Sequence, residues 1–185
     1  MLPGGTTEHV YLRDLVKKRT ILVDRNSEGQ IANANSRISA ISADGRFVAF
    51  LSSASNLPGG DGVHQQIYLR DRKTGKTTLI SRDSAGEPQN GTAYDARISS
   101  NDRLVAFDSD ASNLDGGGST FQVYLRDRAT GRTQLVSHIC FAPGNSDSYY
   151  PSISPDARCV TFDTLATNLG ASSPHTAIVR AGPTG

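Results

Sequence analysis

Arginine and aspartate stand side by side at three places in the sequence, in the phrases VYLRD (10–14), IYLRD (67–71) and VYLRD (123–127). A repeated pair of opposite charges invites an active-site interpretation. Each pair, however, ends a short apolar and aromatic run that is typical of a β-strand, and neighbouring strand residues point to opposite faces. Arg126 and Asp127 therefore cannot serve one ligand together, and we expect the repeated pairs to form ion pairs along a sheet or between neighbouring sheets.

The other residues capable of chemistry do not form the patterns of known catalytic or metal-binding motifs. There is no HExxH motif, no i, i+4 histidine pairing and no GxSxG elbow. The loops PGGDG (58–62) and DGGGS (115–119) weakly resemble calcium or phosphate cradles, but each contains a single aspartate, which is too few for calcium. We therefore predict no catalytic residue, no metal site and no cofactor, and we expect the chain not to be an enzyme. The histidines are His9, His64, His138 and His175.

The two cysteines, Cys140 and Cys159, lie 19 residues apart and lack the CxxC spacing of zinc and redox sites. We expect two unpaired or buried thiols. A disulfide formed in an oxidising compartment is the alternative.

Composition favours many short strands over helices. The 185 residues include 18 Gly, one Met and no Trp, and 36% are hydrophobic. A net charge of +1 gives no global field of the kind that marks nucleic-acid or acidic-membrane binders. No apolar run approaches the roughly 18 residues of a membrane span, and the N-terminus lacks the regions of a signal peptide. We predict a single all-β domain over 1–185, with no nucleic-acid partner and no membrane insertion.

Three phrases recur together along the chain, and one of them is SASNL (53–57), DASNL (110–114) and LATNL (165–169). The YLRD phrases begin at residues 10, 67 and 123, which are 57 and 56 residues apart. SADGRFVAF (42–50), SSNDRLVAF (99–107) and SPDARCVTF (154–162) follow with steps of 57 and 55 residues. Such a period identifies a repeat architecture. The units span approximately 2–56, 57–113 and 114–168, with a partial unit at 169–185.

Each unit predicts four short antiparallel strands. The first strands, at Ile38–Ser42, Asp95–Ser99 and Tyr150–Ser154, lead through Asp/Asn/Gly turns into FVAF, LVAF and CVTF. A Gly-rich loop then leads to the YLRD strand, and a further turn leads to TILVD, KTTLIS or RTQLVS. Both faces of these strands are partly apolar, which is expected when small sheets stack face to face. The sequence predicts about three four-stranded antiparallel sheets.

These phrases resemble the WD-like β-propeller repeat of TolB and related secreted or periplasmic proteins. The core of that repeat is Pro-x-x-Ser-Pro-Asp-Gly-Arg-x-x-Ala-Phe, and PSISPDARCVTFDT (151–164) follows it closely. The turn, the VAF strand, the Asn-Leu pair and the LRDR-TG hairpin recur in order, so the resemblance covers almost the whole chain. Asp102 and Ala157 replace the family glycine, and LVKK replaces R-TG in the first hairpin. We expect these departures to change the turn type locally and to leave the fold unaltered.

The resemblance implies a β-propeller in which the first strand of each unit lies nearest the axis and the fourth lies at the rim. The loops 25–37, 82–94 and 138–149 would then gather at one mouth. It also implies a periplasmic or secreted location, while the chain itself leaves the location open. Asn33, Asn90 and Asn145 recur in these loops. They are either structural turn residues or contacts to a ligand.

Three units are too few to close a propeller, which needs about four blades. The first blade is expected to lack its inner half and the last its outer strand, so that sheet edges stay open. We expect a homo-oligomer in which the N-terminal pair of one chain completes the C-terminal pair of another, and two chains would give the six blades of the TolB type. Repeated recruitment would instead give an open polymer, and a fragment of a longer propeller is the rival explanation. The competing edge residues are Val10, Tyr11, Leu12 and Arg13 against Ala177, Ile178, Val179 and Arg180.

The loop FAPGNSDSYYP (141–151) concentrates Phe141, Tyr149 and Tyr150 beside polar neighbours. Such a mixture is typical of contact surfaces, although ordinary packing of Tyr150 is the alternative. The hypothesis is a non-enzymatic β-propeller module for self-assembly and for interaction with a protein or glycan. Two alternatives stay open, namely an accessory propeller domain of a larger enzyme with a small-molecule site on the axis, and a purely structural subunit. The innermost strands offer only Arg37, Asp95, Arg97 and scattered serines, which favours binding or structure over catalysis.

Overall fold

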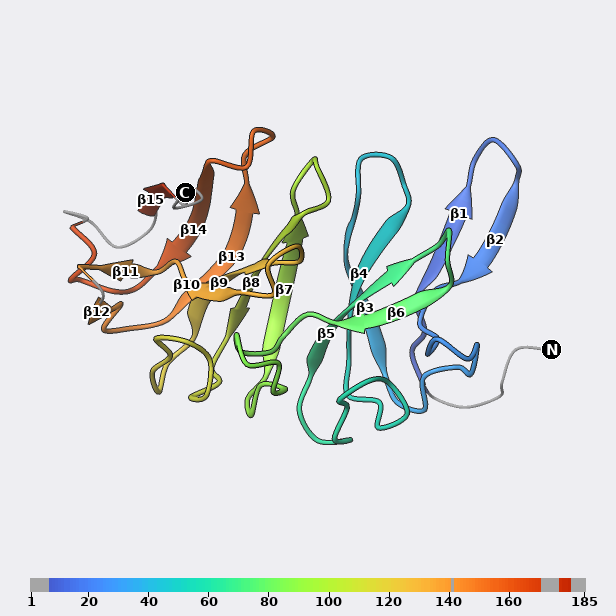
Figure 1. Cartoon of the computed structure of the whole chain (residues 1–185), viewed down its shortest axis with the longest axis horizontal. Coiled ribbons are helices and arrows are strands. Elements are labelled where there is room, and N and C mark those ends of the chain that lie inside the picture. The colour runs from blue at the N-terminus through green and yellow to red at the C-terminus, as the bar shows by residue number, and fades with distance from the viewer. Residues whose placement is uncertain (1–6, 141, 171–176, 181–185) are drawn as a thin grey trace.

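The computed structural model describes residues 7–140, 142–170 and 177–180, and every regular element among them is a β-strand. The sheets follow one another along the longest axis of the molecule, from β1–β2 near the N-terminus to β13–β15 near the C-terminus (Figure 1). Because the end sheets lie far apart, the described sheets form an open series, and they do not close a ring.

Four sheets carry the repeat, and each is antiparallel. The N-terminal hairpin comprises β1 (Tyr11–Asp14) and β2 (Arg19–Leu22). Sheet 1 comprises β3 (Ser36–Ile41), β4 (Phe47–Ser52), β5 (Gln66–Asp71) and β6 (Lys76–Leu79). Sheet 2 comprises β7 (Ala93–Ile98), β8 (Leu104–Ser109), β9 (Gln122–Asp127) and β10 (Thr133–Leu135). Sheet 3 comprises β13 (Ser148–Ile153), β14 (Cys159–Thr164) and β15 (Ala177–Arg180), and a small sheet comprises β11 (His138–Ile139) and β12 (Ala142–Pro143).

The strand order in sheets 1 and 2 follows the chain, so the predicted four-stranded antiparallel units are confirmed. The first strand of each sheet contains a β-bulge, located between Ile38 and Ala40 in β3, between Ala93 and Ala96 in β7, and between Tyr149 and Ser152 in β13. A bulge bends its strand and leaves backbone N–H groups without a ladder partner. These strands also pack against one another, β7 lying between β3 and β13.

The hydrophobic core lies between the sheets. One cluster joins sheets 1 and 2 around Leu51, Ile67 and Phe107, and a second joins sheets 2 and 3 around Val123 and Phe162. A third cluster joins the N-terminal hairpin to sheet 1. Each inner sheet therefore buries both faces, as the apolar residues on both faces of the strands predict.

The adjacent Arg and Asp of the YLRD phrase bind different partners, as their opposite faces predict. Asp127 pairs with Arg103 at 2.6 Å within sheet 2. Arg126 points the other way, where its Nη1 donates to the carbonyl oxygens of Arg82 and Asp83 at 3.3 and 2.7 Å. The aspartates thus form the expected ion pairs along a sheet. The contacts that the arginines make between units are hydrogen bonds to a loop backbone, because the facing loop presents carbonyl groups.

The Arg103–Asp127 pair predicts an acid-dependent term in stability. The Arg103 guanidinium holds the pKa of Asp127 well below its usual range, so the carboxylate stabilises the fold above pH of about 4 and loses this contribution as the pH falls through its folded pKa. We expect Asp127→Asn to lower the free energy of unfolding by about 0.5–1 kcal/mol at pH 7, a small value because Arg103 is half exposed. Urea unfolding at pH 7 and pH 2.5 tests this. A difference between the two proteins that persists unchanged at pH 2.5 would contradict it.

Non-glycine residues keep the glycine geometry of the first turn. Gly45 has a φ of 71°, and Asp102 and Ala157 at the matching positions have φ of 60° and 59°. Lys18 has a φ of 50°, while Gly75 has 73° at the same place in the next hairpin. The expectation that these departures change the turn type is wrong, since the surrounding ladder holds all of them in the left-handed region.

Close packing against neighbouring backbone explains the glycines of the Gly-rich loops. A Cβ on Gly60 would lie 2.1 Å from the carbonyl oxygen of Ala54, and one on Gly117 would lie 2.8 Å from that of Ala111. Asp61 bonds the backbone of its own loop, where it accepts the N–H groups of Val63 and His64. The loops therefore have a structural explanation that needs no bound ion.

Candidate functional site

The loops that enter the first strand of each sheet lie beside the loops between the second and third strands. Asn90 illustrates the link, because its N–H bonds Asn113 Oδ1 at 2.9 Å and its side-chain amide bonds Ser112 Oγ at 3.0 Å. Asn33 bonds Asn56 and Ser55, and Asn145 bonds Asn168 and Thr167, in the same way. The three predicted asparagines thus already have partners in the loops that frame the mouth.

An aromatic row crosses this mouth from sheet 2 to sheet 3. The ring centroids of Tyr94 and Phe121 lie 5.0 Å apart, those of Phe121 and Tyr149 5.0 Å, and those of Tyr149 and Tyr150 6.0 Å. Tyr94 is 57% exposed and Tyr150 is 64% exposed. Phe121 and Tyr149 are half-buried beneath them, so the row offers two outer rings on a packed aromatic base.

Acidic groups fix the base of the row. Asp147 Oδ1 accepts the N–H of Phe121 at 2.9 Å. Burial, together with the neighbouring Asp147 carboxylate, raises the pKa of Tyr149 to about 12. Tyr149 therefore keeps its hydroxyl proton throughout the physiological range and can act as a hydrogen-bond donor.

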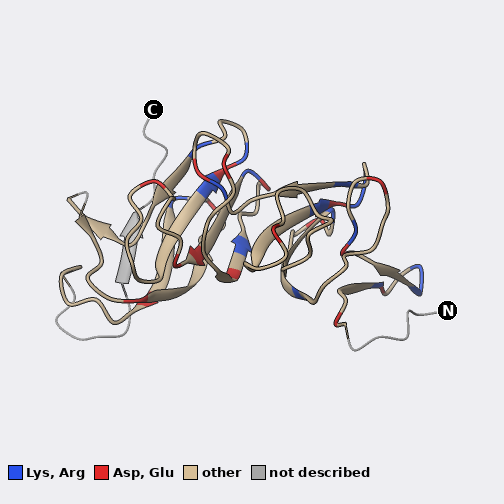
Figure 2. Cartoon of the chain, turned by 90° about the horizontal axis from the view of Figure 1, so that it is seen from below, with Lys and Arg blue, Asp and Glu red and all other residues tan. Residues whose placement is uncertain are grey.

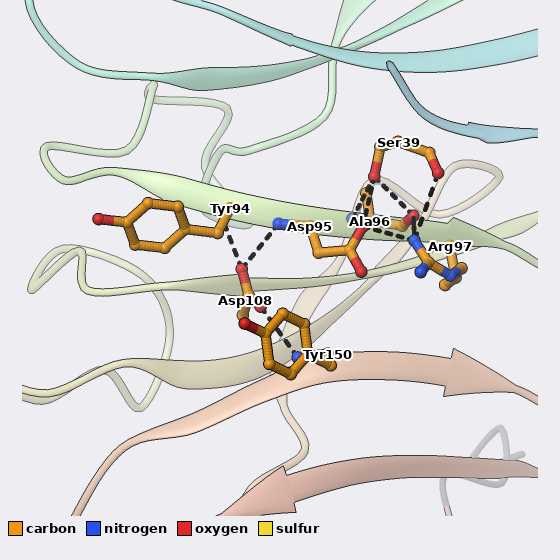
Figure 3. A network of polar contacts seen from close by, with 7 residues as sticks. All are labelled: Ser39, Tyr94, Asp95, Ala96, Arg97, Asp108 and Tyr150. Carbon is orange, nitrogen blue, oxygen red and sulfur yellow. Dashed lines mark hydrogen bonds and ion pairs between the residues drawn. The ribbon is translucent and has the colours of Figure 1, made fainter. Parts of the chain in front are cut away.

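A buried carboxylate positions the two exposed tyrosines (Figure 3). Asp108, on β8, has no exposed surface. Its Oδ1 accepts the N–H groups of Tyr94 and Asp95, both at 2.9 Å, and its Oδ2 accepts the N–H of Tyr150 at 3.1 Å. Burial raises the pKa of Asp108, while the three N–H donors oppose that shift. Asp108 thus fills the bulge of β7 and connects it to β13.

The backbone of Tyr150 has a φ of 54°, in the left-handed region that a bulky residue rarely adopts. The hydrogen bond to Asp108 and the bulge in β13 hold it there. This conformation leaves the ring exposed beside Tyr149, so local strain coincides with the exposed end of the row.

A second polar cluster joins the innermost strands of sheets 1 and 2 (Figure 3). Ser39 Oγ donates to Asp95 Oδ1 at 2.7 Å and to the Ala96 carbonyl at 2.8 Å. The Arg97 guanidinium pairs with Asp95 and donates to the Ala96 carbonyl at 2.8 Å. The acid and the base of this cluster neutralise each other, and the cluster contains no histidine, so it is suited to connecting two strands.

The structure places the other predicted residues as follows. Arg37 lies 3.4 Å from Glu8 in an exposed ion pair. Cys140 and Cys159 are free thiols. Phe141 lies outside the described residues. The predicted edge strands are β1 and β15, and the C-terminal strand occupies the third position of sheet 3 by pairing with β14.

The described residues contain no group of three or more His, Cys, Asp and Glu side chains able to hold a metal ion. Over the same residues, no helix has the length and hydropathy needed to cross a bilayer. The arrangement at the mouth is suited to contact through exposed rings and loop amides.

Comparison with solved structures identifies the architecture. A TolB from Acinetobacter baumannii matches with a TM-score of 0.54 and 17% identity, over 94% of this chain and 37% of that chain. A protein described as a TolB from Agrobacterium tumefaciens matches with a TM-score of 0.59 and 15% identity, over 92% of this chain and 50% of that chain. The fold is that of TolB-type β-propeller domains.

A prolyl endopeptidase structure also matches, with a TM-score of 0.54 and 14% identity, over 96% of this chain and 25% of that chain. This chain therefore spans half or less of the length of the proteins that it resembles. No protein-family model and no curated protein matches the sequence. At these identities the resemblance establishes the fold alone.

Three residues of the site were not predicted from sequence. Tyr94 occupies the repeat position of Tyr149, and that match was the available signal. Asp108 occupies the position of Leu51 in a buried strand, and a carboxylate at an apolar position was the second signal. Nothing in the sequence indicates Phe121, whose contacts depend on the fold.

Proposed function

We propose that the chain is a non-enzymatic β-propeller repeat module that binds a partner protein or a glycan at the mouth and assembles with copies of itself. The observation that carries the proposal is the aromatic row, in which Tyr94 and Tyr150 stay more than half exposed although Asp108 fixes their backbone. Rigid exposed aromatic rings beside adaptable amides are typical of recognition surfaces, because few rotamers are lost on binding.

Open sheet edges support self-assembly. Among the described residues, β1 pairs only with β2, and β15 pairs only with β14. Such edges present unpaired backbone N–H and C=O groups, which readily add a strand from another chain. A compartment outside the cytoplasm stays a proposal that rests on the resemblance to TolB.

A second candidate is an accessory propeller domain of a larger enzyme, with a small-molecule site near the axis. It is favoured by the match to a quarter of a prolyl endopeptidase chain. The innermost strands offer this site only the mutually paired Asp95 and Arg97 and the bonded Ser39. This chain would then contribute binding surface, and a separate domain would carry out the chemistry.

The mouth is tested with Tyr94→Ala combined with Tyr150→Ala. Because both rings are more than half exposed, we expect the stability to urea to change by less than about 1 kcal/mol. Labelled protein is applied to a glycan array and to an array of short peptides. Wild type is expected to bind a subset of spots. The signal of the double variant on those spots is expected to be at least about tenfold weaker, because the contacts of both rings are removed.

Leu165→Ala provides the matched control, since Leu165 is 53% exposed and does not belong to the aromatic row. Its binding signal should equal that of wild type. Binding that survives in the double variant, or a wild type that binds neither array, would contradict a recognition role for the mouth.

A further inference from the structure

A cavity of about 250 Å³ lies between sheets 2 and 3. Its apolar wall is formed by Leu104 and Leu125, and Asp127 and Asp156 lie at its edge. It opens beside the hairpin turn of sheet 2, where Thr130 also lines it. A cavity of this volume between two stacked sheets has room for a further side chain.

The preceding pair of sheets shows which side chain fills this place. Between sheets 1 and 2, the guanidinium carbon of Arg128 lies 4.2 Å from the centre of the Phe47 ring. Arg128 follows directly after β9, and its Nη1 also bonds the Asp102 carbonyl. Leu104 is the repeat equivalent of Phe47, and in the partial unit the position aligned with Arg128 is Gly182, which has no side chain to offer.

The third strand of sheet 3 pairs out of register with the repeat. Phe47 faces Asp71 in sheet 1, and Leu104 faces Asp127 in sheet 2. In sheet 3, Cys159 faces Arg180, whereas the aligned position is residue 181, one residue further along. The register of a strand is set by its hydrophobic pattern. A strand that matches the register of the repeat is therefore expected to pair with β14 better than the slipped β15 does.

The N-terminal hairpin has the sequence and the exposed face of such a strand. Its VYLRD phrase is identical to that of β9, whereas the partial unit reads AIVRA. Tyr11 is 42% exposed, although the matching Tyr68 and Tyr124 are fully buried. Leu15, at the repeat position of Arg128, is 83% exposed. Tyr11 and Arg13 on one face of the hairpin are thus exposed, where the complete sheets bury or half-bury their equivalents.

The opposite face of the hairpin is already occupied. Val10 is 4% exposed and packs with Val48 and Tyr68 of sheet 1. The hairpin can therefore stay on its own sheet 1 while its exposed face and its unpaired edge meet another molecule. No rearrangement of the core is needed for this contact.

We propose that the N-terminal hairpin of a second copy replaces β15 as the outer half of sheet 3, with Leu15 seated in the cavity over Leu104 and with Asp14 opposite Cys159. This inference rests on the proposed self-assembly and assigns its interface. The hairpin turn contains Lys17 and Lys18, and Figure 2 shows basic residues at the tip of this hairpin. They would approach the part of the cavity lined by Asp156, while Asp127 is already paired with Arg103, which also lines the cavity.

The register gives a sharp test that uses a native cysteine. Arg72 N–H bonds the Arg46 carbonyl, so the neighbouring Phe47–Asp71 pair is of the non-hydrogen-bonded type, with Cα atoms about 4.5 Å apart. Two cysteines at the matching Cys159 and Asp14 positions can therefore form a disulfide. In a Cys140→Ser chain, we expect Asp14→Cys to give a dimer on a non-reducing gel after mild oxidation, and Cys159→Ser to abolish it.

Arg13→Cys is the register control, because it would face Cys159 only in the slipped register of β15. A dimer band from Arg13→Cys with none from Asp14→Cys would overturn the register. The absence of both bands in a chain that is dimeric by light scattering would overturn the hairpin interface and leave self-assembly standing. A chain that is monomeric across a dilution series would overturn self-assembly itself.

Leu15→Glu tests the cavity. We expect it to raise the dissociation constant of the dimer by at least about tenfold, because a carboxylate would be buried against Leu104 and Leu125. Val16→Glu is the matched control, since Val16 is 91% exposed at a position that is also exposed in the complete sheets. Equal weakening by both variants would contradict the seating of Leu15.

Discussion

Asp108→Ala is expected to lower the free energy of unfolding by about 2–3 kcal/mol, because it removes the buried acceptor of three part-buried backbone N–H groups. Two of these groups lie at the bulge of β7, where no ladder partner replaces the carboxylate. The third belongs to Tyr150 on the neighbouring sheet. The decrease in the free energy of unfolding should therefore exceed the decrease caused by deleting a side chain of the same volume that makes no hydrogen bonds.

Asp163→Ala is the matched control for this variant. Asp163 holds the same repeat position in β14 as Asp108 holds in β8, but it is exposed. We expect its removal to change stability by less than about 0.5 kcal/mol. Both variants are compared by urea unfolding in the Leu15→Glu background, which keeps copies apart. Similar losses for the two aspartates would show that the hydrogen bonds of Asp108 contribute little.

Arg126→Ala is the second substitution with a large expected effect, about 2–3 kcal/mol. Arg126 is 3% exposed, and its Nη1 bonds the carbonyls of Arg82 and Asp83 and the hydroxyl of Thr133. Its removal takes a charged donor from these acceptors, although the Thr133 hydroxyl still bonds the Arg82 carbonyl and the Gly86 N–H the Asp83 carbonyl, and it loses the packing of the aliphatic stem. We expect a lower urea midpoint with an unchanged slope, which is the signature of a local loss in an intact fold.

Arg13 in the N-terminal hairpin holds the same repeat position as Arg126 and serves as its control. Arg13 is exposed and bonds only Thr20 Oγ1, at 2.9 Å, among the contacts of its guanidinium in the described structure. In the same Leu15→Glu background, Arg13→Ala should be close to neutral in stability. If Arg13→Ala and Arg126→Ala lower the midpoint equally, the hydrogen bonds to the 82–83 backbone are not the source of the effect.

The repeat made most of the fold predictable from sequence. Its turn residues and alternating strands are local signals, and they located β3, β4, β5 and β6 and their equivalents in sheet 2. The first strands start two residues earlier than predicted, as at Ser148 instead of Tyr150, because each contains a bulge that alternation does not reveal.

The candidate site was predictable only in part. Tyr149 and Tyr150 stand out in a short loop, so composition indicated them. Asp108 obtains its role from donors on β7 and β13, which only the register and the bulges bring together. Phe121 likewise contacts Tyr94 and Tyr149 through the stacking of two sheets. Non-local contacts of this kind cannot be derived from a repeated sequence motif and its spacing along the chain.

The position of Asp108 also bears on how the molecule comes apart. In repeat proteins, unfolding spreads through couplings between nearest neighbours, and units with strong couplings open together. At the boundary between sheets 1 and 2 this position carries Leu51, whose contacts weaken gradually as the sheets separate. Asp108 instead shares one carboxylate between β7 and β13, so that separation of sheets 2 and 3 leaves the Tyr150 N–H without its acceptor. Sheets 1 and 2 are joined by polar bonds of the same directional kind, from Ser39 to Asp95 and Ala96, so we expect the three sheets to unfold together.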